Sequence, residues 1–358
     1  MTDAIIIGGG IAGISLGARL APHMDVLVLE AEPLLGYHAS GRSAALFEET
    51  YGLPSTVALN EASRDDHFTL GGGGMVSPRG LMLLDTGDSE AFEADLAQMK
   101  MDEITTQEAR SKVPILDPAR VRRAGYHAQA WDIDTDRLIQ HFAKDIRAHG
   151  GAVQPNATVS GVERTAGGWV VHTVKGNHET GLLCNAAGAW VDQVAAMAGV
   201  APLGFTPLRR SMARIAAPGG HDVSGWPMMF GPGETWYAKP DAGALLVSPA
   251  EEDPSEPMDA WPDDMVLAEG LARYEAAVTE PVTRPIASWA GLRTFSRDRN
   301  LVIGFDPREP AFFWQAGQGG YGFQTAPAAS RLGADLILGK APELDAGTVS
   351  ALAPARFG

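Results

Sequence analysis

The chain begins with two short apolar runs that flank a segment of helical periodicity. Residues 4–7 and 26–29 are continuous apolar runs, and residues 11–20 place apolar side chains at the spacing of one helix face. This order of strand, helix and strand predicts a βαβ unit at the start of the chain.

A glycine-rich turn joins the first strand to this helix. The segment from Gly8 to Gly13 reads Gly-x-Gly-x-x-Gly, in which Gly8 allows a tight turn, Gly10 lets the backbone approach a pyrophosphate, and Gly13 packs the helix on the strand. Glu30 ends the second strand, where an acid can accept the ribose hydroxyls of an adenosine. The combination predicts a dinucleotide site. A glycine-rich turn in an ordinary βαβ unit is the alternative, and it leaves Glu30 unexplained.

The hydrophobic period changes along the rest of the chain. From residue 152 onward it is two, which predicts antiparallel strands, and residues 208–250 give short strands that suit one antiparallel sheet. A polar loop at 37–45 leads into the expected start of a helix after Ala45. The other expected helices are 53–68, 89–101, 137–149, 264–278 and 326–338, and the other expected strands include 75–84, 157–162, 169–174, 182–187, 286–292, 301–304 and 312–316.

These elements predict an α/β chain with two domains. We expect a discontinuous Rossmann-like dinucleotide-binding domain from residues 1–50, 150–200 and 295–345, because strand, glycine turn and helix recur near the C-terminus. Residues 51–149 and 201–294 are expected to form an α+β substrate domain on an antiparallel sheet.

Composition narrows the possible partners and surroundings. The length of 358 residues suits two domains, and a net charge of −16 argues against nucleic acid or an anionic membrane surface. Cys184 is the single cysteine, which excludes an internal disulfide. The sequence contains no run of eighteen apolar residues, so we expect no integral membrane segment and a cytoplasmic protein.

Metal binding finds no support in the sequence. Residues 132–136 resemble the start of a calcium loop, but Arg137 stands where glycine is needed and Ala143 where glutamate is needed. The acids are better explained as caps of the following helix. No zinc, P-loop or serine-hydrolase motif is present.

Motifs spread over most of the chain resemble one family, the FAD-dependent D-amino-acid oxidase superfamily, and within it the bacterial D-arginine dehydrogenases. Besides the N-terminal turn with Glu30, the matching segments are 37–45, 132–136, 185–190, 209–211, 237–243, 289–293 and 318–325. The resemblance implies FAD held without a covalent link, since no cysteine follows Cys184. The cofactor-binding residues implied are Gly8, Gly10, Ile11, Ala12, Gly13, Glu30, Ala31, Ser40, Gly41, Arg42, Ser43, Ala187, Gly188, Gly319, Gly320, Gly322, Gln324 and Thr325.

The resemblance also implies a substrate site for an amino acid. Arginine binds carboxylates through a planar fork, and Arg293 is the leading candidate, with Arg210 second. Tyr51 and Tyr237 match tyrosines that line or cover the family's pocket, and Gly320 matches a residue whose carbonyl faces the substrate amine. The expected reaction is oxidation of the Cα–N bond of a D-amino acid to an imino acid, with the hydride passing to flavin N5. The electron acceptor, whether oxygen, a quinone or a dye, is left open.

Departures from the D-arginine enzymes bear on the substrate side chain. Their glutamate that pairs with the substrate guanidinium is Leu81 here, a pocket histidine is Leu46, and a threonine is Glu48. Gln324 completes the expected pocket wall. A Glu48 that faces the pocket could receive a cation, but surface glutamate is the common case. We therefore expect a neutral or apolar D-amino acid.

Other functions remain open at this point. A sarcosine- or glycine-type amine oxidase and a 2-hydroxyacid dehydrogenase share the flavin motifs. A flavin subunit that only transfers electrons is a further alternative, disfavoured by the presence of Arg210, Tyr237 and Arg293. An NAD-dependent dehydrogenase is disfavoured by the downstream motifs.

Overall fold

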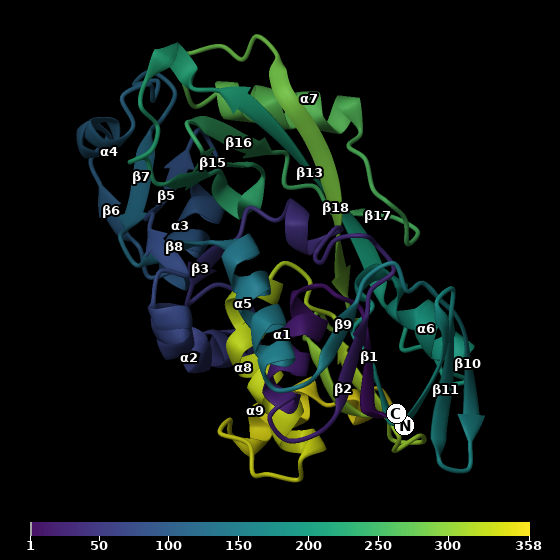
Figure 1. The fold of residues 1–358 in the computed structure, drawn as a ribbon. Helices are drawn as coiled ribbons and strands as arrows, with labels where there is room; N and C mark the ends of the chain where they lie inside the picture. Colours follow the sequence, from purple (N-terminus) through teal and green to yellow (C-terminus); the bar gives the residue numbers. More distant parts are fainter. Residues whose placement is uncertain (1) are drawn as a thin grey trace.

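The computed structural model describes residues 2–358 and contains two large sheets and one small one (Figure 1). The helices are α1 Ile11–Leu20, α2 Pro54–Thr69, α3 Ser89–Gln98, α4 Thr106–Lys112, α5 Thr135–Ala148, α6 Val191–Met197, α7 Asp264–Glu275, α8 Gly322–Ile337 and α9 Ala346–Leu352. The chain is mixed α/β, as its hydrophobic pattern predicts.

The first sheet has eight strands and carries the N-terminal βαβ unit. Its members are β1 Thr2–Ile7, β2 Val26–Leu29, β9 Ala152–Gln154, β10 Val159–Thr165, β11 Gly168–Thr173, β12 Gly176–Asn185, β19 Val302–Phe305 and β20 Phe312–Ala316. The strand β1 lies between β2 and β12 and is parallel to both. The long strand β12 pairs with β11 in its first half and with β20 in its second half. Three distant parts of the chain therefore share one sheet.

Helices cover one face of this sheet. Helix α1 packs against α5 and α8, and α2 packs against α8 (Figure 1). The buried side chains Ile14, Leu16, Phe142 and Leu332 belong to this core. The glycine at Gly17 permits the close packing, because a Cβ there would lie 2.9 Å from Cδ1 of Ile146. The apolar face of each helix thus determines where the helix docks.

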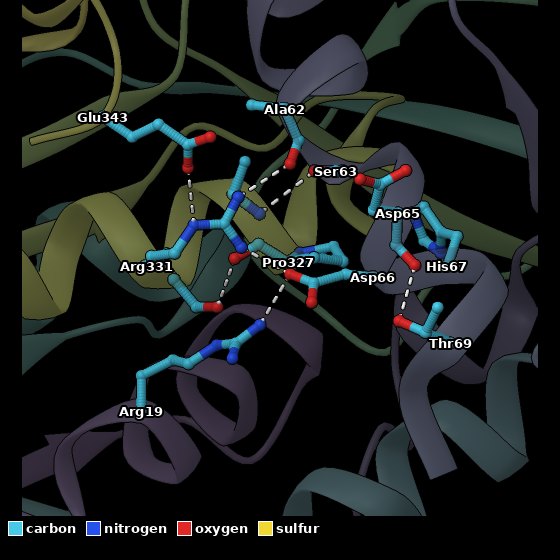
Figure 2. Close-up of polar contacts among 12 residues, drawn as sticks. Arg19, Ala62, Ser63, Asp65, Asp66, His67, Thr69, Pro327, Arg331 and Glu343 are labelled. Atoms are coloured by element: carbon cyan, nitrogen blue, oxygen red, sulfur yellow. Dashed lines mark hydrogen bonds and ion pairs between the residues drawn. The ribbon is translucent and has the colours of Figure 1, made fainter. Parts of the chain in front are cut away.

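Polar contacts also join α1, α2 and α8 (Figure 2). Asp66 accepts a hydrogen bond from Arg19 at 2.8 Å and one from Arg331 at 2.5 Å, and Arg331 also donates to Glu343 at 3.0 Å. Farther along α2, Ser63 accepts a hydrogen bond from the backbone N–H of Ala328 at 3.0 Å. These contacts fix the position of α2 on α8, the helix whose N-terminal turn carries several of the predicted site residues.

The second sheet has nine strands. They are β5 Leu81–Asp85, β6 Asp102–Ile104, β7 Arg123–His127, β13 Thr206–Ala216, β14 Met228–Phe230, β15 Tyr237–Asp241, β16 Ala244–Ser248, β17 Asp253–Pro254 and β18 Pro285–Phe295. All pairs are antiparallel except β14 with β5, which is parallel. The small third sheet contains β3 Leu46–Glu48, β4 Val76–Pro78 and β8 Ala130–Ile133. This arrangement of sheets does not test the predicted division of the chain into two domains, which stays a prediction.

Two predicted elements are wrong. The helix expected to start after Ala45 is absent from that position, where the chain forms the strand β3. The strand expected over 75–84 is two strands in different sheets, β4 and β5. Pro78 ends β4, and Arg79 and Gly80 separate the two strands; Gly80 has a φ of +73°, a left-handed conformation that interrupts a strand.

No helix within residues 2–358 combines the length and the apolar character needed to cross a membrane.

Candidate active site

The glycine turn after β1 is packed so tightly that two of its glycines admit no side chain. A Cβ on Gly8, whose φ is +115°, would lie 2.3 Å from the carbonyl oxygen of Ala186, and a Cβ on Gly13 would lie 2.0 Å from that of Gly8. A Cβ on Gly10 would meet only Oγ of Ser40, at 3.2 Å. Gly8 and Gly13 therefore shape the turn, and Gly10 keeps open the space in front of it.

The N-terminus of α1 can receive an anion. Its N-cap residue is Gly10, which has no side chain, and its first turn contains no acidic residue. Ser40 accepts a hydrogen bond from the backbone N–H of Ile11 at 3.1 Å. The free N–H groups and the positive end of the helix dipole favour a phosphate here.

Glu30 is buried beside this turn. Its Oε2 accepts a hydrogen bond from the backbone N–H of Gly9 at 2.6 Å, and its Oε1 accepts one from Glu32 at 2.8 Å. Burial raises the pKa of Glu30, and the two backbone N–H groups partly oppose that shift. Each carboxylate oxygen retains a further lone pair for a ribose hydroxyl.

Two connected clefts run from Glu30 past the helix N-terminus. The first cleft, of about 1480 Å³, is lined by Gly8, Gly10, Glu30, Ala31, Ala187 and Gly188, among others. The second cleft, of about 930 Å³, is lined by Ile11, Ala12, Ser43, Gly319, Gly322 and Gln324, among others. Gly10, Ser40, Arg42 and Gly188 line both. The clefts together form the elongated site that an extended dinucleotide needs.

Three of the predicted cofactor residues line neither cleft. Gly13 packs against Gly8, and a Cβ on Gly41 would lie 2.6 Å from the carbonyl oxygen of Gly36. Thr325 is fully buried and donates its hydroxyl to the carbonyl of Tyr321 at 2.8 Å. Gly13 and Thr325 are buried behind the site and shape its walls, whereas Gly41 is exposed and closes the turn with Gly36.

Arg42 uses its guanidinium within the protein. Nη1 donates to the carbonyls of Ala260 and Ala290 at 3.0 and 2.9 Å, and Nη2 donates to Asp259. The backbone carbonyl of Arg42 accepts from the indole of Trp289 at 3.2 Å. Arg42 therefore ties the cofactor loop to the second sheet.

A central cavity adjoins the second cleft. Ser43, Arg293, Gly320 and Gln324 line both spaces. The cavity is also lined by the predicted residues Leu46, Glu48, Tyr51, Leu81 and Tyr237, and by Met99, Met228, Phe230 and Glu234, which the sequence analysis did not single out. It has apolar walls with a few polar groups, as small-molecule sites do.

Arg293 and Arg210 lie on neighbouring antiparallel strands. Arg210 on β13 is paired with Gly291, two residues from Arg293 on β18, so the two arginines are diagonal neighbours on one face. Arg293 lies against Gly320, where a Cβ would stand 3.0 Å from its Nη1. Arg210 is 5% exposed, and its Nη1 is buried with no hydrogen-bond partner among residues 2–358.

The two arginines differ in the direction of their pKa shifts. Burial lowers the pKa of Arg293, but Tyr237, Tyr51 and Glu234 outweigh it and the net shift is upward. Burial and the nearby charge of Arg293 lower the pKa of Arg210. Since a guanidinium stays protonated in proteins, both carry a positive charge. Arg210 does not line the central cavity; it lines the second cleft and an outer cleft that also contains Tyr51, Glu234 and Arg293.

The segment that carries Tyr51 is held by Asn60, a residue that sequence reasoning missed. Nδ2 of the fully buried Asn60 donates to the carbonyls of Glu48, Glu49 and Tyr51 at 3.3, 3.2 and 3.1 Å. Gln324 donates to the same Tyr51 carbonyl at 3.3 Å. Burial, and secondly the charge of Glu234, raise the pKa of Tyr51 well above its usual value, so its hydroxyl is protonated.

A buried charge network supports the segment that lines both the second cleft and the central cavity. Lys239 donates to the carbonyl of Ala45 at 3.2 Å and lies 3.0 Å from Asp132, which also pairs with Arg79. Asp132 was expected as part of a capping segment and of a segment that matches the family, and not as the partner of Lys239. No signal along the sequence links Lys239 to Asp132, because the two are 107 residues apart and meet only in the folded chain.

Glu48 does not point to solvent, so that expectation is wrong. It is 3% exposed, and its Oε1 accepts hydrogen bonds from the N–H and hydroxyl of Thr50 at 2.9 and 2.6 Å. Its Oε2 lies 3.0 Å from Nε2 of His127, which is also buried. The expectation of a neutral or apolar substrate depended on a surface position of Glu48, and Glu48 does not have that position.

Among residues 2–358, no group of three or more His, Cys, Asp or Glu side chains is arranged to hold a metal ion. Cys184 is fully buried in β12, and burial raises the pKa of its thiol.

Comparison with known proteins agrees with this geometry. The family model described as FAD dependent oxidoreductase (DAO) matches residues 3–336. The chain is 25% identical over 372 residues to glycine oxidase of Pseudomonas putida, covering 96% of each chain. It is 25% identical over 401 residues to FAD-dependent oxidoreductase domain-containing protein 1 of Bos taurus, covering 94% of this chain and 81% of the bovine protein.

Solved structures share the fold across the whole chain. L-proline dehydrogenase from P. horikoshii superposes with a TM-score of 0.84 at 24% identity, covering 99% of this chain and 97% of that one. Glycine oxidase from Geobacillus kaustophilus superposes with a TM-score of 0.82 at 22% identity, covering 97% of each chain.

The donors of the two clefts suit FAD. The unoccupied N–H groups of α1 and the open space at Gly10 would hold the pyrophosphate, Glu30 would hold the ribose, and the walls at Ser43 and Gly319 would hold the flavin end. The family model spans nearly the whole chain. The chain belongs to the DAO family of FAD-dependent oxidoreductases, and its cofactor is FAD.

Proposed function

We propose that this protein oxidises the Cα–N bond of a D-amino acid to an imino acid. The observation that carries the proposal is the position of Arg293, whose guanidinium lies against Gly320 at the junction of the central cavity and the second cleft. A planar guanidinium there can bind a substrate carboxylate through two hydrogen bonds. This would hold Cα next to the flavin end of the cofactor site.

The surrounding residues would bind and orient the substrate. Arg210, diagonal to Arg293 and with a free Nη1, adds a second positive charge at the carboxylate end. The protonated Tyr51 hydroxyl can donate a hydrogen bond, and the carbonyl of Gly320 can accept one from the substrate amine. FAD supplies the acceptor for the hydride that leaves Cα.

The apolar walls keep water away from the reacting atoms. Leu46, Leu81, Met228 and Phe230 line the cavity beside the charged groups. Excluding water strengthens the attraction between Arg293 and a carboxylate, because the local dielectric constant is low. Binding and desolvation are therefore the main tasks of these residues.

The preference for the D-enantiomer rests on the match of the pocket motifs to the bacterial D-arginine dehydrogenases. The central cavity collects Tyr51, Tyr237, Arg293, Gly320 and Gln324, which are the positions that the resemblance implies.

A glycine- or sarcosine-type amine oxidase is the second candidate. The similarity to glycine oxidase of Pseudomonas putida over 96% of each chain favours it. The apolar residues Leu46, Leu81, Met228 and Phe230 in the cavity wall favour a substrate that has a side chain. A dehydrogenase that acts on a 2-hydroxyacid would need the same arginine. The anaerobic screen described next distinguishes it from an enzyme that oxidises amino acids.

An anaerobic screen tests the proposal. The purified protein is expected to be yellow, to release FAD on acid treatment, and to lose its visible absorbance with a D-amino acid but not with the L-enantiomer. The screen includes glycine, N-methylglycine and 2-hydroxyacids. If glycine, N-methylglycine or a 2-hydroxyacid bleaches the flavin and no D-amino acid does, the proposal is rejected.

A further inference from the structure

The wall of the central cavity contains a buried carboxylate, that of Glu48, whose charge is opposite to the charge of Arg293. Leu46 and Glu48 are two residues apart on β3, so their side chains share one face, and both line the cavity. Phe47 between them points the other way into the core beneath α8. The side chain of Glu48 therefore faces the same space as the substrate.

His127 reaches this spot from another strand. It is directly opposite Leu81 in the pairing of β7 with β5, and residues directly opposite each other in a sheet point to the same side. Leu81 lines the cavity, so His127 lies on the cavity side of β7. Two separate sheets thus bring Glu48 and His127 together.

The contact between them leaves hydrogen-bonding capacity unused. Oε2 of Glu48 and Nε2 of His127 are 3.0 Å apart, but this contact does not have the geometry of a hydrogen bond. Neither atom has a hydrogen-bond partner among the described residues. Oε1, by contrast, is fully engaged by Thr50. A buried carboxylate oxygen without a donor is costly, which is a reason to expect a ligand donor.

The cavity wall therefore carries charges of both signs. Arg293 provides a positive charge, and Glu48 provides a negative one beside His127, with Leu46, Leu81 and Phe230 among the apolar residues of the wall. The other ionisable groups that face the cavity are Tyr51, Glu234 and Tyr237. A second carboxylate on the substrate would meet the carboxylate of Glu48.

We propose that Glu48, supported by His127, accepts a hydrogen bond from the end of the substrate side chain. The site then selects amino acids whose side chains end in an amino, guanidino or amide group, over apolar side chains of the same length, and disfavours acidic ones. This inference rests on the proposed amino-acid oxidation and specifies its substrate class.

The test compares side chains of matched length in both enantiomeric series. Lysine is paired with norleucine, and glutamine is compared with methionine and glutamate, with anaerobic flavin reduction giving the rate constant divided by Kd. We expect the wild-type protein to favour lysine over norleucine and glutamine over methionine, and to reduce slowest with glutamate. A preference for norleucine and methionine would overturn the proposal.

Variants locate the preference at Glu48. Glu48→Gln keeps the shape and removes the charge, and the lysine-to-norleucine ratio is expected to fall roughly 10- to 100-fold, as for a lost hydrogen bond to a charged group. Glu49→Gln is the matched control, because Glu49 pairs with Arg64 and does not line the cavity; it should leave the ratio within about twofold. An unchanged ratio in Glu48→Gln would overturn the proposal.

A second variant guards against misfolding. His127→Gln keeps a polar side chain beside Glu48 and removes any competing positive charge, so the ratio is expected to hold or to rise. A fall in the lysine-to-norleucine ratio as large as that in Glu48→Gln would show that Glu48 and His127 act only as a structural pair. This result would overturn the proposal. FAD content, read from the visible spectrum, confirms that each variant is folded.

The enantiomers separate this inference from the proposed function. If only L-amino acids reduce the flavin, the proposed D-specificity fails, while the lysine-to-norleucine ratio in the L-series still tests Glu48. If neither series reduces the flavin, both are rejected.

Discussion

Replacement of Arg293 by alanine is the most informative perturbation of the proposed carboxylate site. The guanidinium lies in the cavity wall against Gly320, where a Cβ would come within 3.0 Å of Nη1. Hydrogen bonds to charged groups contribute about 1.5 to 3 kcal/mol each, and truncating one partner of a buried charged pair costs about 2 to 5 kcal/mol. This corresponds to a rise in substrate Kd of roughly 30- to 5000-fold.

The neighbouring Arg210 decides where in this range the value falls. Arg210 stays in place on β13 and continues to offer its free Nη1, so we expect the lower half of the range. Arg293→Lys should lie between the wild-type protein and Arg293→Ala, because an ammonium keeps the charge and loses the planar fork.

Stopped-flow reduction of the flavin under anaerobic conditions measures this effect directly. Kd for the substrate is read from the dependence of the reduction rate on concentration, and the FAD content is read from the oxidised spectrum. Arg209→Ala serves as the control, since Arg209 lies next to Arg210 on β13 and its side chain pairs with Asp253 at 3.0 Å. If Kd in Arg293→Ala stays within about threefold of the wild-type value, Arg293 is not the carboxylate site.

Two further predictions concern stability. Asn60→Ala leaves buried carbonyls of Glu48, Glu49 and Tyr51 without a donor, at a cost of about 1 to 3 kcal/mol, and should lower the melting temperature of the FAD-bound protein by several degrees; an unchanged melting temperature would contradict this role. Burial raises the pKa of Asp298, but hydrogen bonds from Arg356 and Ser296 outweigh it and hold the pKa well below its usual range. The stabilisation is therefore complete above the unfolded-state value of about 4 and is lost as the pH falls below it, so Asp298→Asn should lower the melting temperature at pH 7 and by clearly less at pH 3.

The parts of the fold that depend on local sequence were predictable. The glycine turn, the acid at Glu30 and the strands around them follow from residue types whose conformational demands are local. The strand over 75–84 was mispredicted because Pro78 and Gly80 interrupt an apolar pattern that otherwise continues. The helix expected after Ala45 does not form, because pairing of residues 46–48 with β8 prevails over local propensity.

Residues of the site could be predicted from the sequence only at positions that match a family motif. Tyr51, Tyr237, Arg293 and Gly320 were found by resemblance, and the structure brings them to one cavity. Glu48 was misplaced, because its burial depends on His127, which is contributed by a distant strand. The supporting residues Asn60 and Lys239 act through backbone carbonyls, and such contacts leave no pattern in the sequence.

The most direct test of the account is anaerobic reduction of the bound flavin by the two enantiomers of one amino acid. Lysine is the substrate of choice, because it engages both Arg293 and Glu48 in the proposed arrangement. We predict loss of the oxidised flavin absorbance with D-lysine and no loss with L-lysine over the same time. Reduction by L-lysine alone, or by neither enantiomer of any amino acid, would contradict the proposed function.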